Sequence, residues 1–497
     1  MPNTNSLNTF AGRTINELKD EIQSLYLKNS TPWVIGYSGG KDSTAVVQLI
    51  YLSLLELPTE QRKKVVYVLS SDTKVETPSI VNHIDINLEL IQKAAQKDGL
   101  PIEAVKVEPN VTNTFWVNLL GRGYPAPSQN FRWCTDRMKI KPANNFISDQ
   151  VSKYGEVIMV LGVRSDESIS RANTLKKNKD KYNPESLLSR HSTLSGAYVY
   201  PVIQDFSTDD VWTFLLQYES PWGFDNNSLL SLYRSANAGE CPLVIDTSTS
   251  SCGNSRFGCW TCTVVTQDKA LSAMVDNGED WLEPLLDFRD MLASTQTPEG
   301  KKKYRSHKRR NGQVNFITRK TKVRGESIRE EEYLSSELAF GPYKFEYLKY
   351  FLEELLKTEK AVNDSNPSDS YFELVSIAEL EEIRKFWKME QQDWEDSVPQ
   401  IYEKVMQKDY PMKSLKGGGF TGIEYQLLDR ICQESEIPTQ LVAKLLDTAR
   451  SYDGLKRRSK ALDDLKSVIT EEWRSPEEIL EARKKQVEKR TKYEEVQ

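Results

Sequence analysis

The chain of 497 residues contains no apolar run of the roughly eighteen residues that a membrane span requires, so we expect no membrane association. Its N-terminus lacks the basic region and apolar stretch of a secretory signal, and we expect a cytoplasmic protein. Histidine is scarce, with three residues, and none is placed as a general base. The formal net charge of -6 excludes a protein that coats nucleic acid uniformly, because such a protein needs a positive field to displace counterions from phosphate.

The composition is that of an ordinary globular protein, with 38% hydrophobic and 28% charged residues. The length exceeds what one hydrophobic core usually serves, which predicts more than one domain. The polar stretch 363–370 is the predicted flexible linker. We predict an α/β domain with a lead-in helix over residues 1–205, a helical cysteine-rich segment over 206–300, a basic then acidic connecting region over 301–362 and a helical region over 371–497.

Short β-rich runs alternate with helical stretches in the first part of the chain. A capping box of Thr14 and Glu17 predicts a helix that begins at these residues and precedes the first β-rich run. The alternation predicts the α/β fold class, with a mostly parallel sheet flanked by helices and with ligands at the carboxyl ends of the strands. The predicted strands are residues 33–37, 65–69, 102–107, 157–163 and 198–203.

The sequence Ser38-Gly39-Gly40-Lys41-Asp42-Ser43, which we term the phosphate loop, lies between the first strand and a predicted helix over residues 43–55. Glycines without Cβ atoms let backbone N–H groups close on an anion, and the helix start adds partial positive charge. Ser38 and Ser43 can donate hydrogen bonds, and Lys41 can neutralise phosphate oxygens. Asp42 either shares in this chemistry or caps the helix. The spacing departs from the Walker A pattern, which disfavours transfer of a γ-phosphate.

Three further polar residues are candidates for contact with a nucleotide. Asp72 follows a strand, where a carboxylate can meet a ribose hydroxyl or bound Mg2+, or can cap a turn. Arg164 and Arg171 bracket Glu167, and the planar guanidinium of arginine favours bidentate contact with phosphate. The alternative for these arginines is a surface ion pair.

Four of the six cysteines, Cys241, Cys252, Cys259 and Cys262, follow the spacing C-x10-C-x6-C-x2-C. A reducing compartment disfavours disulfides, so the spacing predicts a metal or redox site. Zinc and an iron–sulfur cluster both suit four thiolates. The alternative is that some of these thiols are buried and pack as small apolar side chains, which is our interpretation of Cys432.

Cys134 lies among Arg132, Arg137 and Lys139 in the sequence. Nearby cations lower the pKa of a thiol, and a thiolate suits a nucleophile or a carrier of persulfide sulfur. We favour this catalytic role for Cys134. Metal ligation and a buried inert thiol are the alternatives.

Residues 301–324 contain eleven Lys or Arg and no acidic residue. This basic stretch is either a docking patch for a polyanion or a solvated loop.

The phosphate loop resembles the PP-loop of ATP pyrophosphatases, enzymes that split ATP between its α and β phosphates and adenylate a substrate. Several downstream motifs resemble those of sulfonucleotide reductases. The cysteine segment resembles the DndC family, the sulfurtransferase of DNA phosphorothioation. The motifs are Ser71-Asp72-Thr73 with Glu76-Thr77-Pro78, Arg132-Trp133-Cys134-Thr135 with Lys139, Gly162-Val163-Arg164 with Arg171, and Gly239-Glu240-Cys241-Pro242 through Cys252 to Gly258-Cys259-Trp260-Thr261-Cys262.

The resemblance implies an ATP-dependent sulfurtransferase that uses ATP, Mg2+ and an iron–sulfur cluster, of the 4Fe–4S type, held by the four clustered cysteines. It further implies DNA as the substrate, a cysteine desulfurase as the sulfur donor and other phosphorothioation subunits as partners. Adenylation of a DNA phosphate would precede replacement of a non-bridging oxygen by sulfur. The implied catalytic residues are Lys41, Asp42, Cys134 and Arg164, and the implied nucleotide-binding residues are the phosphate loop, Asp72, Arg164 and Arg171.

Three alternatives are compatible with the same loop. A phosphoadenosine phosphosulfate reductase shares the loop and the arginine motifs, but such enzymes use a mobile C-terminal cysteine, and no cysteine follows Cys432. A tRNA thiolase would place sulfur in bases instead of DNA. A non-catalytic nucleotide-sensing subunit would not require Lys41.

Overall fold

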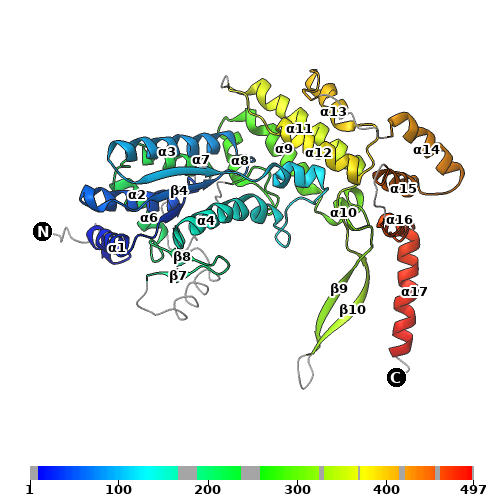
Figure 1. The fold of residues 1–497 in the computed structure, drawn as a ribbon, viewed down its shortest axis with the longest axis horizontal. Helices are drawn as coiled ribbons and strands as arrows, with labels where there is room; N and C mark the ends of the chain where they lie inside the picture. Colours follow the sequence, from blue (N-terminus) through cyan, green and yellow to red (C-terminus); the bar gives the residue numbers. More distant parts are fainter. Residues whose placement is uncertain are drawn as a thin grey trace. The chain divides into compact units, whose positions relative to one another are not determined.

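A computed structural model describes residues 9–165, 187–236, 258–323, 329–367, 370–412, 420–453 and 459–494 (Figure 1). The chain divides into two compact units. Unit 1 comprises residues 1–115, 127–289 and 362–372, and unit 2 comprises residues 116–126, 290–361 and 373–497. No helix among the described residues has both the length and the apolar character needed to cross a membrane.

Unit 1 is built on a six-stranded sheet in the order β5-β4-β3-β6-β8-β7. The first five strands in this order run parallel, and only the edge strand β7 is antiparallel to its neighbour. The predicted fold class, a mostly parallel sheet flanked by helices, is confirmed. The strands are β3 (Trp33–Gly36), β4 (Val66–Ser71), β5 (Ile102–Val107), β6 (Val157–Val160), β7 (Ser189–Arg190) and β8 (Ala197–Tyr200).

Side chains alternate across β3, because successive residues of a strand point to opposite faces. Ile35 packs into a core that also contains Ile50 of α2 and Ile91 of α3, whereas Val34 packs with Ile147 of α4 on the other face. Figure 1 shows α3 and α4 on opposite sides of the sheet. The helices of this unit are α1 (Ile15–Leu27), α2 (Lys41–Leu55), α3 (Pro78–Lys97), α4 (Lys141–Tyr154), α6 (Thr208–Gln217), α7 (Asn226–Ala236) and α8 (Lys269–Asp276), and α9 (Glu283–Ser294) crosses the boundary between the units.

The capping box predicted for the lead-in helix is present at the start of α1, where Glu17 and Thr14 satisfy each other's backbone N–H groups. The predicted domain boundary near residue 205 does not coincide with a unit boundary. Gln48 of α2 donates to the carbonyl oxygen of Tyr218 at 2.7 Å, and Asn226 at the start of α7 donates to Gln48 at 3.1 Å. These buried bonds tie the segment after residue 205 to the phosphate-loop helix, so both lie in unit 1.

Unit 2 is mainly helical in its C-terminal part, as predicted. Its hairpin of β9 (Phe316–Val323) and β10 (Arg329–Leu338) was not predicted, because charged residues interrupt the apolar pattern of both strands. The predicted linker 363–370 begins inside α11 (Phe345–Ser365), which crosses the boundary between the units. The remaining helices are α10 (Pro298–Tyr304), α12 (Ile377–Glu390), α13 (Ser397–Met406), α14 (Gly422–Glu434), α15 (Thr439–Ser451), α16 (Ala461–Ile469) and α17 (Pro476–Glu494).

Candidate nucleotide and thiol site

The phosphate loop joins β3 to α2, in the strand–loop–helix order that the sequence predicts. Gly40 is the N-cap of α2 and has no side chain to cap it, so the first N–H groups of the helix are available to an anion or another acceptor. Gly39 has φ +72°, and a Cβ built on it would lie 2.8 Å from Ile84. Gly39 is therefore required by its positive φ and by the close approach of α3, whereas Gly40 has an ordinary φ of −82° and a Cβ on it would lie 3.2 Å from the Tyr233 hydroxyl.

The two serines of the phosphate loop form hydrogen bonds within the loop. Ser43 Oγ accepts from the backbone N–H of Ser38 at 3.2 Å and donates to the carbonyl oxygen of Gly40 at 3.0 Å. Ser38 Oγ lies 3.2 Å from Ser43 Oγ. These hydrogen bonds within the loop hold it in a fixed turn. Binding of an anion therefore costs less conformational entropy than it would in a mobile loop.

Asp42 bridges two cations at the start of α2. Its Oδ2 accepts from Lys41 Nζ at 2.8 Å, and its Oδ1 accepts from Arg164 Nε at 2.7 Å. Asp42 makes no capping bond, so the interpretation of this residue as a helix cap is wrong. Arg164 is 3% exposed and the Asp42 side chain 18% exposed, so the alternative of a surface pair is also wrong: the pair is largely buried and links the segment after β6 to α2. The other candidate arginine, Arg171, lies outside the described residues, as does Glu167.

Two residues that the sequence did not reveal contact the phosphate loop. His83 of α3 lies with Nε2 3.0 Å from the carbonyl oxygen of Gly39. His83 is half-buried, and burial lowers its pKa. Tyr233 of α7 accepts a hydrogen bond from the backbone N–H of Lys41 at 3.1 Å. No sequence signal could have found either residue, since both are brought to the loop only by helix packing.

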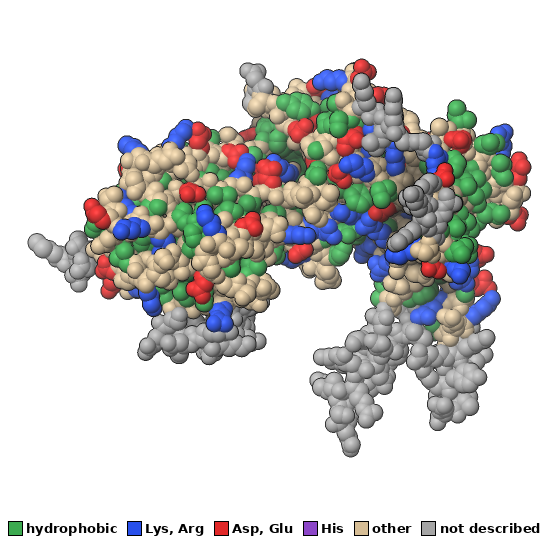
Figure 2. All heavy atoms as spheres, in the orientation of Figure 1, with side chains coloured by type: hydrophobic (Ala, Val, Ile, Leu, Met, Phe, Trp, Pro, Cys, Tyr) green, Lys and Arg blue, Asp and Glu red, His purple; other side chains and the backbone are tan. Residues whose placement is uncertain are grey.

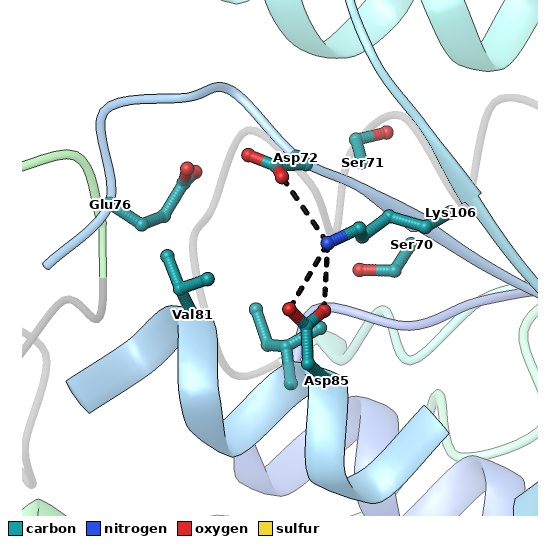
Figure 3. A pocket seen from close by; sticks show the side chains of 8 residues that line it. Ser70, Ser71, Asp72, Glu76, Val81, Asp85 and Lys106 are labelled. Atoms are coloured by element: carbon teal, nitrogen blue, oxygen red, sulfur yellow. Dashed lines mark hydrogen bonds and ion pairs between the residues drawn. The ribbon is translucent and has the colours of Figure 1, made fainter. Parts of the chain in front are cut away.

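A shallow pocket lies at the carboxyl end of β4, beside the phosphate loop (Figure 3). Asp72 stands there as predicted, and its Oδ1 also accepts from the backbone N–H of Lys74 at 2.8 Å in a turn. Lys106 of β5 donates to Asp85 of α3 at 2.8 Å and lies 3.5 Å from Asp72. The pocket is lined by Ser70, Ser71, Asp72, Glu76, Val81, Ile84, Asp85 and Lys106. Since Ile84 also contacts Gly39, the pocket and the loop share one wall.

The Cys259–Cys262 turn packs against the chain that follows β4. Cys259 forms an antiparallel bridge with Glu76, and its Sγ lies 3.3 Å from Thr73 Oγ1. The backbone N–H of Cys262 donates to the carbonyl oxygen of Cys259 at 3.0 Å, which closes the turn. The sequence did not indicate that this turn lies close to Glu76, a residue of the acidic pocket.

Lys139 interacts electrostatically with Cys134 and with both cysteines of this turn. Electrostatic interaction with Cys259 is the largest cause that raises the pKa of Lys139, and interactions with Glu76, Cys134 and Cys262 raise it further. Because such charge effects fall off with distance, the three cysteines lie in the neighbourhood of one ammonium group. Cys241 and Cys252 lie outside the described residues.

The expectation that neighbouring cations lower the pKa of Cys134 is wrong. Burial raises the pKa of Cys134, and burial raises that of Cys259 to about 12. Arg137, one of the cations counted in the sequence, donates instead to Asn113 at 2.8 Å. The cost of placing a thiolate in an apolar environment therefore exceeds the attraction of the cations that remain nearby.

Arg289 of α9 stabilises the cysteine turn through hydrogen bonds to backbone carbonyl groups. Its side chain is fully buried, and it donates to the carbonyl oxygens of Cys262 and Thr266, each at 3.0 Å, and to that of Val265. The planar guanidinium suits such a set of carbonyl acceptors. Among the described residues no group of three or more His, Cys, Asp or Glu is arranged to hold a metal ion. A cluster would thus need ligands from beyond the described ranges, for which Cys241 and Cys252 are the candidates.

The basic stretch 301–324 lies in unit 2 and is partly neutralised. Arg305 donates to the carbonyl oxygens of Phe340 and Gly341, and Arg310 pairs with Glu390. On the face drawn in Figure 2, Lys and Arg side chains are mixed with Asp and Glu. The exposed cations of this stretch that the structure describes are Lys302, Lys303, Arg309 and Arg310.

Residues 32–265 match the model of the phosphoadenosine phosphosulfate reductase domain. This match supports the PP-loop, phosphoadenosine phosphosulfate reductase-like superfamily for that part of the chain and indicates a nucleotide-binding enzyme of sulfur chemistry. An uncharacterized protein of Methanocaldococcus jannaschii is 24% identical over 210 residues, which cover 41% of this chain and 36% of that protein. The chain thus spans about a third of the length of this relative.

A solved structure, the phosphoadenylyl-sulfate reductase of Candida auris in a phosphate complex, matches over 41% of this chain and 85% of its own. Its sequence identity is 13% and its TM-score 0.26. None of these matches separates the DndC family from the reductases.

Proposed function

We propose that this chain binds ATP at the phosphate loop, splits it between the α and β phosphates and uses the activation to transfer sulfur to a substrate phosphate. The proposal rests on the phosphate loop at the N-terminus of α2, which its own hydrogen bonds hold in place and which has Lys41 in the first turn of the helix. Backbone N–H groups, a helix N-terminus and one ammonium group together stabilise the negative charge of a triphosphate.

In the first step, a non-bridging oxygen of the substrate phosphate attacks the α-phosphorus of ATP, the α–β anhydride bond breaks, and pyrophosphate leaves. Lys41 stabilises the charge that develops on the phosphate oxygens, and Asp42 holds the Lys41 ammonium in place. Mg2+ would shield the same oxygens, with Asp72 as its candidate ligand. The substrate then carries AMP, which is a better leaving group than oxide.

In the second step, a persulfide on Cys134, loaded by a cysteine desulfurase, attacks the substrate phosphorus and AMP leaves. A thiol reductant then cleaves the sulfur–sulfur bond, so that the outer sulfur stays on phosphorus as a phosphorothioate and Cys134 forms a mixed disulfide. A second equivalent of thiol restores Cys134. An iron–sulfur cluster, if bound by Cys241, Cys252, Cys259 and Cys262, would supply electrons or sulfide at this site.

The acidic pocket beside the loop favours ATP over a sulfonucleotide. Asp72, Glu76 and Asp85 line it with three carboxyl groups, against the ammonium groups of Lys106 in the lining and of Lys74, which lies 3.5 Å from Asp72. Carboxylates accept hydrogen bonds from ribose hydroxyls. The negative charge of these carboxylates would instead repel the 3′-phosphate of phosphoadenosine phosphosulfate. We expect the protein to bind an ATP analogue at least tenfold more tightly than adenosine 3′,5′-bisphosphate, as measured by calorimetry. A preference for the bisphosphate would contradict this assignment.

The second candidate function is a phosphoadenosine phosphosulfate reductase, which the matched family model favours. The two functions differ in their products. Pyrophosphate formation from ATP, dependent on a phosphate-bearing substrate and a sulfur donor, supports the sulfurtransferase. Thiol-dependent release of sulfite from phosphoadenosine phosphosulfate supports the reductase. A tRNA thiolase is distinguished by sulfur in tRNA bases.

The acceptor in this proposal is a DNA backbone phosphate, on the resemblance to the DndC family. The exposed Lys302, Lys303 and Arg309 would contribute to DNA contact, with partner subunits supplying the rest because the chain is acidic overall. Replacing all three by glutamate is expected to weaken association of the assembled complex with DNA by about tenfold or more at low salt, measured by fluorescence anisotropy. Lys484→Glu, an exposed residue of α17, serves as the single-charge control. Unchanged association and modification would remove this stretch from the DNA site.

A further inference from the structure

A histidine from α3 holds one peptide of the phosphate loop. His83 Nε2 lies 3.0 Å from the carbonyl oxygen of Gly39, and its ring packs edge-on against Phe224 with centroids 5.2 Å apart. A ring nitrogen forms a hydrogen bond with a carbonyl oxygen only when that nitrogen carries a proton. The contact therefore depends on which tautomer His83 adopts.

Two neighbours determine the tautomer. Trp222 Nε1, which can only donate, lies 3.0 Å from Asn87 Oδ1 and so fixes the orientation of the Asn87 amide. The Nδ2 group of Asn87 then faces His83, 2.9 Å from its carbonyl oxygen and 3.4 Å from Nδ1. Because Nδ2 donates, Nδ1 is the acceptor and Nε2 carries the proton. Burial lowers the pKa of His83, against a smaller opposing effect of the Gly39 carbonyl, and this favours the neutral ring.

The bond to Gly39 also orients the next N–H group. In a trans peptide the C=O and N–H bonds are nearly antiparallel, so a Gly39 carbonyl that points to α3 directs the Gly40 N–H away from α3. A Gly-Gly peptide is the one most free to rotate, because neither residue has a Cβ. Without an external bond, this peptide would populate orientations that turn the Gly40 N–H away from a bound phosphate.

We propose that His83, held in its Nε2–H tautomer by Asn87 and Trp222, is a positioning residue that presents the Gly40 N–H to the nucleotide phosphate. The inference rests on the proposed function, since it assumes that a nucleotide binds at the phosphate loop. His83 acts through the loop backbone and makes no contact with the reacting atoms.

The test combines nucleotide affinity with a direct observation of the ring. His83→Leu removes the donor and is expected to weaken binding of α,β-methylene ATP by about tenfold in calorimetry, the effect of one lost hydrogen bond. His83→Gln places an amide donor near the position of Nε2 and should restore affinity to within about threefold of wild type. His307→Gln, a histidine of unit 2, is the matched control and should bind as wild type does.

Long-range 1H–15N spectra of the histidine-labelled wild-type protein should show His83 as the Nε2–H tautomer. The chain has only three histidines, so assignment needs just His191→Gln and His307→Gln. Trp222→Phe frees the Asn87 amide to rotate and should yield a mixture of tautomers. An Nδ1–H tautomer in wild type, or wild-type affinity in His83→Leu, would overturn the inference and leave the proposed function intact. A wild-type protein that binds no adenine nucleotide would overturn both, whatever the tautomer.

Discussion

Lys41→Ala is expected to lower the rate of pyrophosphate release from ATP by on the order of 10²- to 10³-fold, the effect of removing one group that stabilises developing charge. Lys41 opens α2, and its Nζ lies 2.8 Å from Asp42. As the α–β anhydride breaks, negative charge grows on the phosphate oxygens, and alanine offers nothing to balance it. The measurement is a coupled pyrophosphate assay at saturating ATP, with substrate and sulfur donor present.

The fold should survive this substitution, because Lys41→Ala leaves the buried pair of Asp42 and Arg164 in place. Asp42→Asn is a poorer probe of chemistry, since it would leave the buried Arg164 without its carboxylate and so destabilise unit 1. Lys93→Ala, on the exposed face of α3, is the matched control and should retain wild-type turnover. Pyrophosphate release at the wild-type rate in Lys41→Ala, with an unchanged melting temperature, would contradict the catalytic role proposed for Lys41.

The central strands β3, β4 and β6 were predictable because each is a mainly apolar run, and burial on both faces leaves no need for alternation. Val66–Ser71 shows this, and the edge strand Ile102–Val107, which carries Glu103 and Lys106 and is only partly buried, was also placed to within two residues by local sequence. The hairpin of β9 and β10 was missed for the opposite reason. Its stability comes from pairing between strands whose own sequences are mostly polar or charged, and pairing is not visible in one strand at a time.

The residues of the candidate site likewise divide into those that the sequence could predict and those that it could not. The phosphate loop could be predicted from six adjacent residues, since its glycines and serines act on their own backbone. His83 and Arg289 could not, because each acts on a backbone carbonyl distant in sequence. The pKa of Cys134 was predicted in the wrong direction, because the cations can be counted in the sequence but the burial of the thiol cannot.

Cys134→Ala is expected to reduce sulfur incorporation to the level seen without protein while leaving ATP-dependent pyrophosphate release above half of the wild-type rate. The reason is that Cys134 belongs to the second step only, whereas the first depends on the phosphate loop. Cys134 precedes a π-helical segment, Thr135–Ile140, and such turns often occur at functional sites. Sulfur incorporation is measured by mass spectrometry of the substrate digest, on protein purified without oxygen.

The matched control is Cys432→Ala, a buried thiol of α14 in unit 2, which should incorporate sulfur as wild type does. Iron and acid-labile sulfide analysis separates the two roles considered for Cys134. If Cys134→Ala keeps its iron but loses sulfur transfer, the thiol carries sulfur. If iron is lost together with sulfur transfer, Cys134 is a cluster ligand beside Cys259 and Cys262, and the sulfur carrier lies elsewhere. The shared influence of the three thiols on Lys139 makes this second outcome a physical alternative, so the iron content decides the role.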